Sequence, residues 1–355
     1  MSGFHWLASY PKSGNTWLRL ALWALRHGRS GGIGDVVGWI PVSGGRTAFD
    51  AMLDIESSDL DQAEVELLRP RFFEAMARET TEPMLRKVHE AWLRTPAGEP
   101  LFPPAVTLGA IYMVRDPRDV AVALSFHLDL SLDETIAFMA DPAAGLFSKT
   151  TRLYRQFACP LLTWSLHVES WLDTPDVRVL MVRYEDMVAD LPAELGRVAR
   201  FLGWSAGPEA IAAAVEGTRF DRLRSEEERL GFCERPPGME RFFRRGEAGG
   251  WRDTLSPRSR PLRTHPDAVR FSAEGLPTKR YPDPWRSPEF FARRATDETK
   301  SNHERASPNS PPAEWSRVTT VRILCGLKVV SDLPRRCTGI GWRGARSARN
   351  GCSAC

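Results

Sequence analysis

One stretch near the N-terminus constrains the fold of this chain most: an apolar run, a short polar loop and an apolar helical pattern. The run FHWLASY, residues 4–10, is typical of a short buried strand that Pro11 ends. The loop KSGNT supplies a lysine, a glycine and hydroxyl residues, and an apolar helical stretch, WLRLALWAL, follows. Because the first N–H groups of a helix lack partners, this order predicts an anion-binding loop, with a simple capping turn as the alternative.

Further apolar runs follow at residues 83–89, 109–114 and 177–187, and helical patterns separate them. Asp116 and Pro117 have the residue types that start a helix, and Gly203 ends a second helix that begins at residue 191. Apolar strands that alternate with helices predict a three-layer α/β/α fold with a central parallel sheet, in a P-loop-like architecture. The loop YPKSGNT and the segments VRDPRD and VRYED lie at the ends of such strands and should meet at the carboxyl edge of the sheet.

Composition excludes several classes of protein. The chain has 355 residues, a net charge of +3 and 42% hydrophobic residues, which indicates a soluble globular protein without a nucleic-acid partner. No apolar run approaches the roughly 18 residues of a membrane span, and the N-terminus does not resemble a signal peptide. The six cysteines have no metal-ligand spacing. These features predict a cytoplasmic protein with free thiols and no metal site.

The charge changes sign near residue 256. Residues 257–355 hold 19 Lys and Arg residues against 9 Asp and Glu residues, and they carry 11 of the 27 prolines. Their segments show neither helical nor strand periodicity. We therefore expect a folded domain over residues 1–256 and an irregular or disordered basic tail over residues 257–355. A reading-frame shift near residue 257 is the alternative origin of this tail.

Four motifs in order carry a resemblance to a known family. SYPKSGNTW resembles the 5′-phosphosulfate loop of the sulfotransferases, whose pattern is close to Y-P-K-[SA]-G-T-T-W, and departs from it at Asn15. MVRDPRDVAVALSFH is similar to the 3′-phosphate motif, VRYEDM to the strand after it, and FFRRGEAGGWRDTLS to the C-terminal R-K-G-x-x-G-x-W segment. The resemblance covers residues 4–256. It implies transfer of a sulfuryl group from 3′-phosphoadenosine 5′-phosphosulfate (PAPS) to an acceptor hydroxyl or amine.

The resemblance also implies which residues bind this donor. The residues implied are Lys12, Ser13, Gly14, Asn15 and Thr16 for the 5′-phosphosulfate, Trp17, Thr218 and Phe220 for adenine, Tyr184 as a further nucleotide contact, and Arg115, Arg244, Arg245 and Gly246 for the 3′-phosphate. Ordinary core packing is the alternative for Trp17 and Phe220. A solvated basic pair is the alternative for the two adjacent arginines.

Lys87 and His89, in the segment LRKVHEAW, match the K-x-H pattern that the family places at the end of a strand. By this resemblance, Lys12, Lys87 and His89 are the catalytic residues. A neutral histidine can accept the proton of an acceptor hydroxyl, and the two lysines can stabilise the charge on the departing oxygen. The reaction is then an in-line displacement that needs no metal.

One position departs from the 3′-phosphate motif. The serine expected eight residues after Arg115 is Ala123, and Ser125 lies about 200° further around a helix. A hydrogen bond to a charged group contributes roughly 1.5–3 kcal/mol, so we expect weaker donor binding. A non-catalytic nucleotide-binding protein with a decayed site therefore stays an alternative, and a small-molecule kinase is a weaker one because no G-x-x-x-x-G-K-[ST] string occurs. The sequence leaves open which small molecule is the acceptor and whether the chain forms a homodimer.

Overall fold

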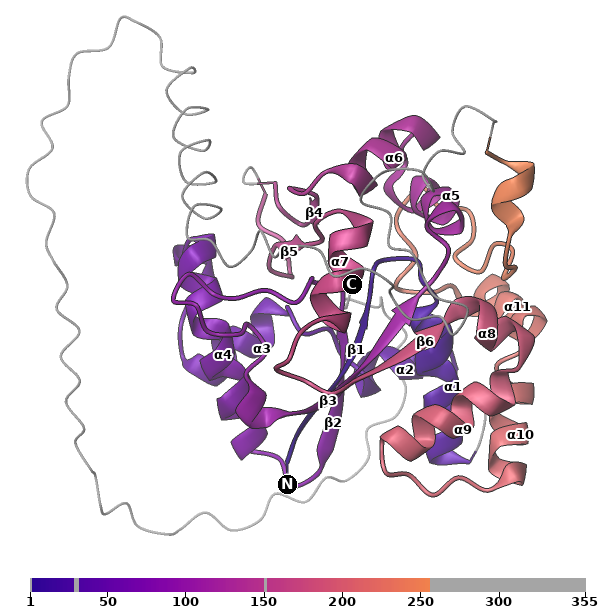
Figure 1. Cartoon of the computed structure of the whole chain (residues 1–355), viewed down its shortest axis with the longest axis horizontal. Helices are drawn as coiled ribbons and strands as arrows, with labels where there is room; N and C mark the ends of the chain where they lie inside the picture. The colour runs from indigo at the N-terminus through magenta and orange to yellow at the C-terminus, as the bar shows by residue number, and fades with distance from the viewer. Residues whose placement is uncertain (1, 29–31, 150–151, 256–355) are drawn as a thin grey trace, which may run out of the picture. The chain divides into compact units, whose positions relative to one another are not determined.

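The computed structural model describes residues 2–28, 32–149 and 152–255, so the predicted tail at 257–355 lies outside the described residues. The described residues belong to one compact unit. Its centre is a parallel sheet of β1 (Gly3–Ser9), β2 (Pro83–Val88), β3 (Thr107–Val114) and β6 (Val179–Arg183). The order across the sheet is β2-β1-β3-β6, so β1 and β3 are the inner strands (Figure 1). The predicted central parallel sheet is therefore confirmed.

Side chains alternate between the two faces of the sheet, as the pleat of a strand requires. On β1, Phe4, Trp6 and Ala8 belong to one apolar cluster. Leu7 belongs to a second cluster on the opposite face. Every residue of β1 is buried, which explains why its sequence reads as a continuous apolar run.

Helices cover both faces. The first apolar cluster takes residues from α3 (Arg46–Leu53), α4 (Gln62–Arg78) and α7 (Trp164–Leu172). The second takes residues from α1 (Asn15–His27), α8 (Tyr184–Ala189), α9 (Leu191–Phe201) and α10 (Pro208–Gly217). Figure 1 shows α3 and α4 on the side of the sheet away from α1, α9 and α10. This arrangement confirms the predicted three layers.

The remaining described elements are shorter or lie at the rim. They are α2 (Asp35–Trp39), α5 (Pro117–Leu128), α6 (Leu132–Ala140), α11 (Phe220–Leu230), the short pair β4 (Gly145–Leu146) and β5 (Cys159–Pro160), and the 3-10 turns η1 (Ser57–Asp59), η2 (Pro104–Val106) and η3 (Gly250–Asp253). The Asp116 side chain accepts a hydrogen bond from the Arg118 N–H and caps α5, as its position predicts. None of the helices described is long and apolar enough to cross a membrane.

One predicted boundary was wrong. The strand expected over residues 177–187 ends at Arg183, and Tyr184 begins helix α8. Glu185 and Asp186 lie in the first turn of this helix, where negative charge is favourable. The sequence does not show this boundary, because Met187 of α8 is apolar and buried and so continues the apolar pattern of the strand.

Candidate functional site at the carboxyl edge of the sheet

The four strands end beside the residues that the sequence singles out. Ser9 ends β1 ahead of the lysine loop, Val88 ends β2 ahead of His89, and Val114 ends β3 ahead of Arg115. Tyr184 follows the end of β6. Because parallel strands have their carboxyl ends at one edge, these residues gather at that edge of the sheet.

The loop between β1 and α1 has an unusual backbone. Lys12 and Gly14 both have positive φ, at 69° and 97°. A Cβ at Gly14 would lie 2.6 Å from Cδ2 of Tyr184, so only glycine fits this position. The backbone is thereby pressed against the Tyr184 ring, and the loop has the close turn that an anion-binding cradle needs.

The loop presents hydrogen-bond donors that the described residues leave unused. No side chain caps the N-terminus of α1. The Ser13 hydroxyl is fully buried and has no partner among the described residues. A buried donor without a partner is costly, and an anion in the loop would satisfy it. These donors fit a phosphate or sulfate group.

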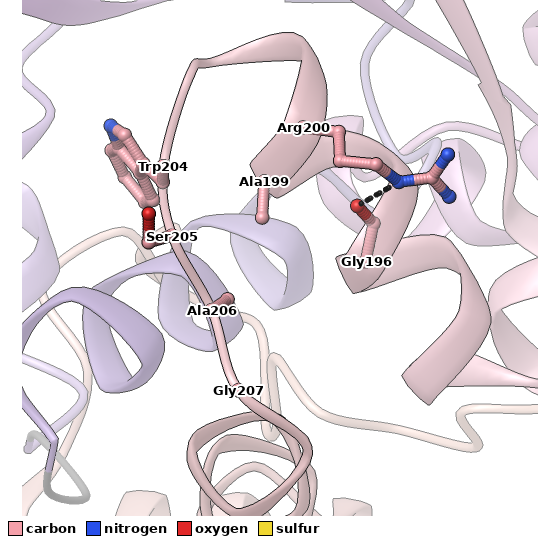
Figure 2. A pocket seen from close by; sticks show the side chains of 7 residues that line it. All are labelled: Gly196, Ala199, Arg200, Trp204, Ser205, Ala206 and Gly207. Carbon is pink, nitrogen blue, oxygen red and sulfur yellow. Dashed lines mark hydrogen bonds between the residues drawn. The ribbon is translucent and has the colours of Figure 1, made fainter.

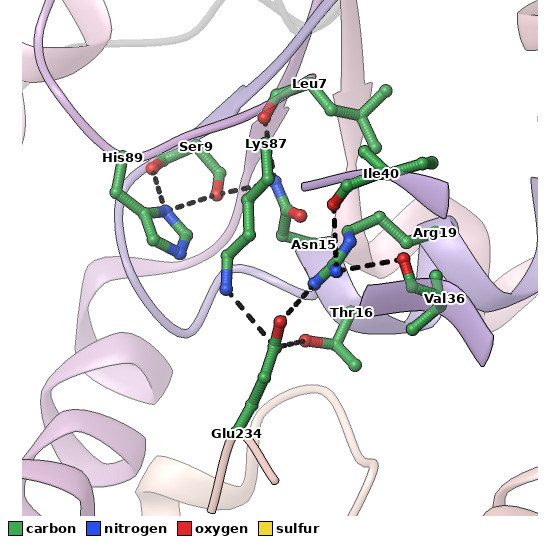
Figure 3. A network of polar contacts seen from close by, with 10 residues as sticks. All are labelled: Leu7, Ser9, Asn15, Thr16, Arg19, Val36, Ile40, Lys87, His89 and Glu234. Carbon is green, nitrogen blue, oxygen red and sulfur yellow. Dashed lines mark hydrogen bonds and ion pairs between the residues drawn. The ribbon is translucent and has the colours of Figure 1, made fainter. Parts of the chain in front are cut away.

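Asn15 uses its side chain elsewhere. Its Nδ2 donates to the Leu7 carbonyl at 3.0 Å and to the Ser9 hydroxyl at 3.3 Å. Figure 3 shows these contacts between the start of α1 and the end of β1. The Asn15 amide nitrogen is therefore engaged by β1 and not by the loop, and its Oδ1 is buried without a partner among the described residues.

Lys12 lies in a protein environment that disfavours its charge. Its Nζ lies 4.0 Å from the centre of the Phe242 ring. Burial, together with the nearby charges of Lys87 and Arg115, lowers the pKa of Lys12 to about 7, although Glu234 opposes the shift. An anion bound in the loop would restore the charge to this lysine.

Glu234 lies inside the group of cations at the loop. Its carboxylate contacts Nη1 of Arg19 at 2.7 Å and Nζ of Lys87 at 3.2 Å, and it accepts a hydrogen bond from the Thr16 hydroxyl at 3.2 Å. Figure 3 shows the carboxylate between these three side chains. The positive charges of Lys87 and Arg19 lower the pKa of Glu234 despite its burial, so the group stays ionised.

The ring of His89 is held by the end of β1. Its Nδ1 lies 2.8 Å from the Ser9 carbonyl oxygen and 3.3 Å from the Ser9 hydroxyl. Because a carbonyl only accepts, Nδ1 carries the proton and Nε2 keeps its lone pair. Burial and the charge of Lys87 lower the pKa of His89 well below its ordinary value. The ring is therefore neutral at neutral pH and can act as a base through Nε2.

Two further histidines lie in this region, His167 beside His89 and His127 near the two lysines. His167 is fully buried; its Nε2 lies 3.0 Å from the His89 carbonyl and its Nδ1 lies 2.8 Å from the Tyr112 hydroxyl. His127 lies on α5. Burial and, to a smaller extent, the nearby charges of Lys12 and Lys87 lower its pKa to about 3. Its Nδ1 is buried without a partner among the described residues.

The residues expected around adenine come together. The Trp17 indole donates to the Thr218 carbonyl at 3.0 Å, and its ring lies edge-on to Tyr184 at 5.8 Å. A Cβ at Gly246 would lie 2.3 Å from Cδ2 of Phe220, which brings the C-terminal motif against this aromatic group. The Thr218 hydroxyl donates to the Ala214 carbonyl at 2.8 Å, so toward a base it can act only as an acceptor.

The residues expected around the 3′-phosphate also meet. Arg115 donates to the carbonyls of Lys12, at 3.2 Å, and Glu247, at 2.9 Å. Burial, Arg245 and Arg115 lower the pKa of Arg244, which indicates concentrated positive charge. Arg245 and Gly246 are exposed at the end of this cluster.

Asp119 fixes the C-terminal motif to α5. Its carboxylate accepts hydrogen bonds from the backbone N–H groups of Gly249, at 2.6 Å, and Trp251, at 2.9 Å. Trp251 also packs on Val122. This anchor explains how a segment more than 120 positions along the chain reaches the end of β3.

Ala123 and Ser125 lie as the helical angle predicts. Ala123 is half-buried on α5. The Ser125 hydroxyl donates to the Val122 carbonyl at 3.0 Å and is therefore engaged by its own helix. No shift in the helix brings Ser125 into the position of the expected serine.

Two other features are separate from the loop. In the part of the chain that the structure describes, no cluster of three His, Cys, Asp or Glu side chains suits a metal ion.

A hollow of about 470 Å³ lies where α9 leads into α10, lined by residues such as Arg200 and Trp204 (Figure 2). The centre of the Trp204 ring lies 5.6 Å from Cζ of Arg26. Arg26 is in the last turn of α1, at the opposite end of that helix from the loop. The hollow therefore does not belong to the site.

Comparison with known proteins identifies the family. The model of the sulfotransferase domain family matches residues 5–261. Cytosolic sulfotransferase 13 of Arabidopsis thaliana is 29% identical to the chain, and the match covers 71% of the chain and 71% of the relative. Cytosolic sulfotransferase 12 of the same organism is 28% identical, and the match covers 70% of the chain and 72% of the relative. A solved structure, mouse sulfotransferase SULT7A1 complexed with PAP, is 18% identical with a TM-score of 0.46, and the alignment covers 86% of each chain. The chain belongs to the sulfotransferase domain family, and it is a sulfotransferase.

Sequence reasoning missed several residues of the site. Arg19 is a fully buried cation inside an apolar helical stretch, and that mismatch of residue and surroundings was a usable signal. Glu234 and Phe242 lie in irregular chain after α11, where no periodicity marks them. His127 was hidden at the end of the 3′-phosphate motif.

Proposed function

We propose that this sulfotransferase transfers a sulfuryl group from PAPS to a hydroxyl group, or an amine, of a small molecule. One observation carries the proposal: the lysine loop, the Lys87–His89 pair and Arg115 meet at one edge of the sheet. This arrangement combines an anion cradle, a neutral base and a second cationic cluster. A simple capping turn would need none of these.

The donor is proposed to bind across the two cationic regions. Its 5′-phosphosulfate fits the loop because the Ser13 hydroxyl lacks a partner and α1 has no side-chain cap. Its 3′-phosphate fits Arg115, with Arg244, Arg245 and Gly246 beside it. The aromatic group of Trp17, Tyr184 and Phe220 suits the adenine ring between them.

The proposed chemistry uses side chains of the chain itself. PAPS supplies the sulfuryl group. As the acceptor oxygen bonds to sulfur and the bond from sulfur to the phosphate oxygen breaks, the acceptor proton passes to Nε2 of His89. Lys12 and Lys87 stabilise the negative charge that grows on the departing phosphate oxygen. Adenosine 3′,5′-bisphosphate leaves, and the proposed mechanism needs no metal ion because lysines carry the charge.

Three broader features are also proposals. The catalytic domain is proposed to end near residue 256, because the motifs end there. A cytoplasmic location is proposed because two relatives are named cytosolic sulfotransferases. Association as a homodimer is a further proposal, which sedimentation or light scattering would test.

An acceptor screen tests the proposed function. The purified chain is mixed with PAPS labelled in the sulfuryl group and a panel of alcohols, phenols and amines. We expect a labelled product and an equal amount of adenosine 3′,5′-bisphosphate with at least one acceptor. Binding of the nucleotide without any transfer favours the non-catalytic alternative. Transfer from ATP instead would favour a kinase.

A further inference from the structure

The site contains a carboxylate side chain, that of Glu234, in contact with its cations. Glu234 projects from the irregular segment after α11, and its carboxylate contacts Lys87 and the Thr16 hydroxyl. Both residues are ones that the proposed function gives to the donor. The carboxylate therefore lies among the groups that would hold the phosphosulfate.

Arg19 fixes this carboxylate in place. Its guanidinium is fully buried and bonds Glu234 at 2.7 Å through Nη1. Its Nη2 donates to the carbonyls of Val36 and Ile40, at 3.3 Å and 3.1 Å, so the guanidinium cannot swing away. Figure 3 shows the side chains of Arg19, Lys87 and Thr16 around the carboxylate. A charge held this firmly is part of the site and not a loosely placed surface group.

The same segment covers Lys12. Phe242, eight residues after Glu234, lies with its ring centre 4.0 Å from the Lys12 ammonium. Backbone N–H groups of Phe242 and Phe243 donate to the buried carboxylate of Glu227 at 2.7 Å and 2.9 Å, which anchors this part of the segment to α11. The segment therefore has a fixed end at Phe242 and Phe243, and a charged contact at Glu234.

We propose that Glu234 is a resident anion of the donor site, and that the nucleotide binds by displacing its carboxylate from Lys87 and Thr16. The inference rests on the proposed function. The 5′-phosphate or phosphosulfate is the competing group, because Thr16 and Lys87 belong to the 5′ end of the site. Glu234 thus sets the affinity for the 5′ end of the donor and leaves the 3′ end untouched. After the exchange, Nη2 of Arg19 still donates to the carbonyls of Val36 and Ile40, so the buried guanidinium keeps hydrogen-bond partners.

Calorimetry with two nucleotides tests the exchange, at pH 6.0 so that Lys12 is charged. Glu234→Gln keeps the size and the hydrogen-bonding capacity of the side chain and removes its charge. We expect it to bind adenosine 3′,5′-bisphosphate at least about tenfold more tightly than the parent, and adenosine 3′-phosphate with unchanged affinity. Glu228→Gln is the matched control, since Glu228 is an exposed carboxylate on α11 that pairs with Arg241 at 3.3 Å. It should change neither affinity.

Other outcomes overturn the inference. Unchanged or weaker binding of the bisphosphate by Glu234→Gln, or equal tightening of both nucleotides, shows that Glu234 does not compete with the 5′ group. If Glu234→Gln fails to fold, Glu234→Asp draws the carboxylate back by one methylene and should tighten bisphosphate binding in the same direction. No binding of the bisphosphate by the parent or any variant would overturn the proposed function, and this inference with it.

Discussion

The charge of Lys12 should make capture of the donor depend on pH near neutrality. Burial and the charge of Lys87 lower the pKa of Lys12 to about 7 in the free protein. The ammonium is therefore present below that pH and is lost as the pH rises through it. A neutral lysine attracts the anionic donor much more weakly than an ammonium group does. The value of kcat/KM for PAPS should therefore fall as the pH rises above about 7.

The size of this fall follows from the titration. The value of kcat/KM reports ionisations of the free enzyme, and the charged fraction drops about tenfold for each pH unit above the pKa. Between pH 7.5 and pH 8.5, kcat/KM should therefore fall by nearly an order of magnitude. Lys12→Arg keeps a positive charge at all these pH values, so its profile should stay flat there even if its absolute rate is lower.

Initial-rate measurements at subsaturating PAPS, from pH 6 to pH 9, provide the assay. Lys87 is the second lysine of the site, so Lys87→Arg is the matched comparison and should retain the alkaline fall. A parent profile that stays flat to pH 9 would show that the charge of Lys12 does not control capture of PAPS. An alkaline fall of equal size in Lys12→Arg would assign it to another group.

The remaining predictions concern the base, the 3′-phosphate motif and the domain boundary. His89→Ala should reduce turnover of aliphatic alcohols by about 10²–10⁴ and that of acidic phenols only mildly, with unchanged affinity for the bisphosphate; a larger loss in His127→Ala would move the base to that histidine. Ala123→Ser should tighten PAPS and the bisphosphate up to about tenfold to a hundredfold, and should not affect adenosine 5′-phosphosulfate, which calorimetry can compare. Removal of residues 260–355 should leave nucleotide binding unchanged, and aggregation or lost binding of the shortened chain would contradict the proposed boundary.

Local patterns were enough to predict the sheet and its loop. β1 and β3 are buried on both faces, so their sequences are continuous apolar runs that stand out from the helices. The rule that ligands bind at the carboxyl edge of parallel strands then predicted that the loop with Lys12, the segment with Arg115 and the segment with Tyr184 meet there, whereas His89 came from the resemblance to the family. The end of β6 was misplaced because a buried residue in α8 continued the apolar pattern.

Contacts between distant segments were beyond sequence reasoning. Arg19 and Glu234 are 215 positions apart, and nothing periodic marks the irregular segment that carries Glu234. The direction of the Asn15 side chain was equally hidden, because its partners are a backbone carbonyl and a hydroxyl at the end of β1. Such bonds depend on how the loop turns, which the positive φ at Lys12 and Gly14 decides.

The most direct test of the account is the stoichiometry of transfer. The chain is incubated with labelled PAPS and the best acceptor of the panel, and sulfated product and adenosine 3′,5′-bisphosphate are measured together. We expect one molecule of bisphosphate for each sulfated product, and loss of both in Lys12→Ala with the fold intact by circular dichroism. Turnover of Lys12→Ala within about threefold of the parent, or no sulfated product with any acceptor, would contradict it.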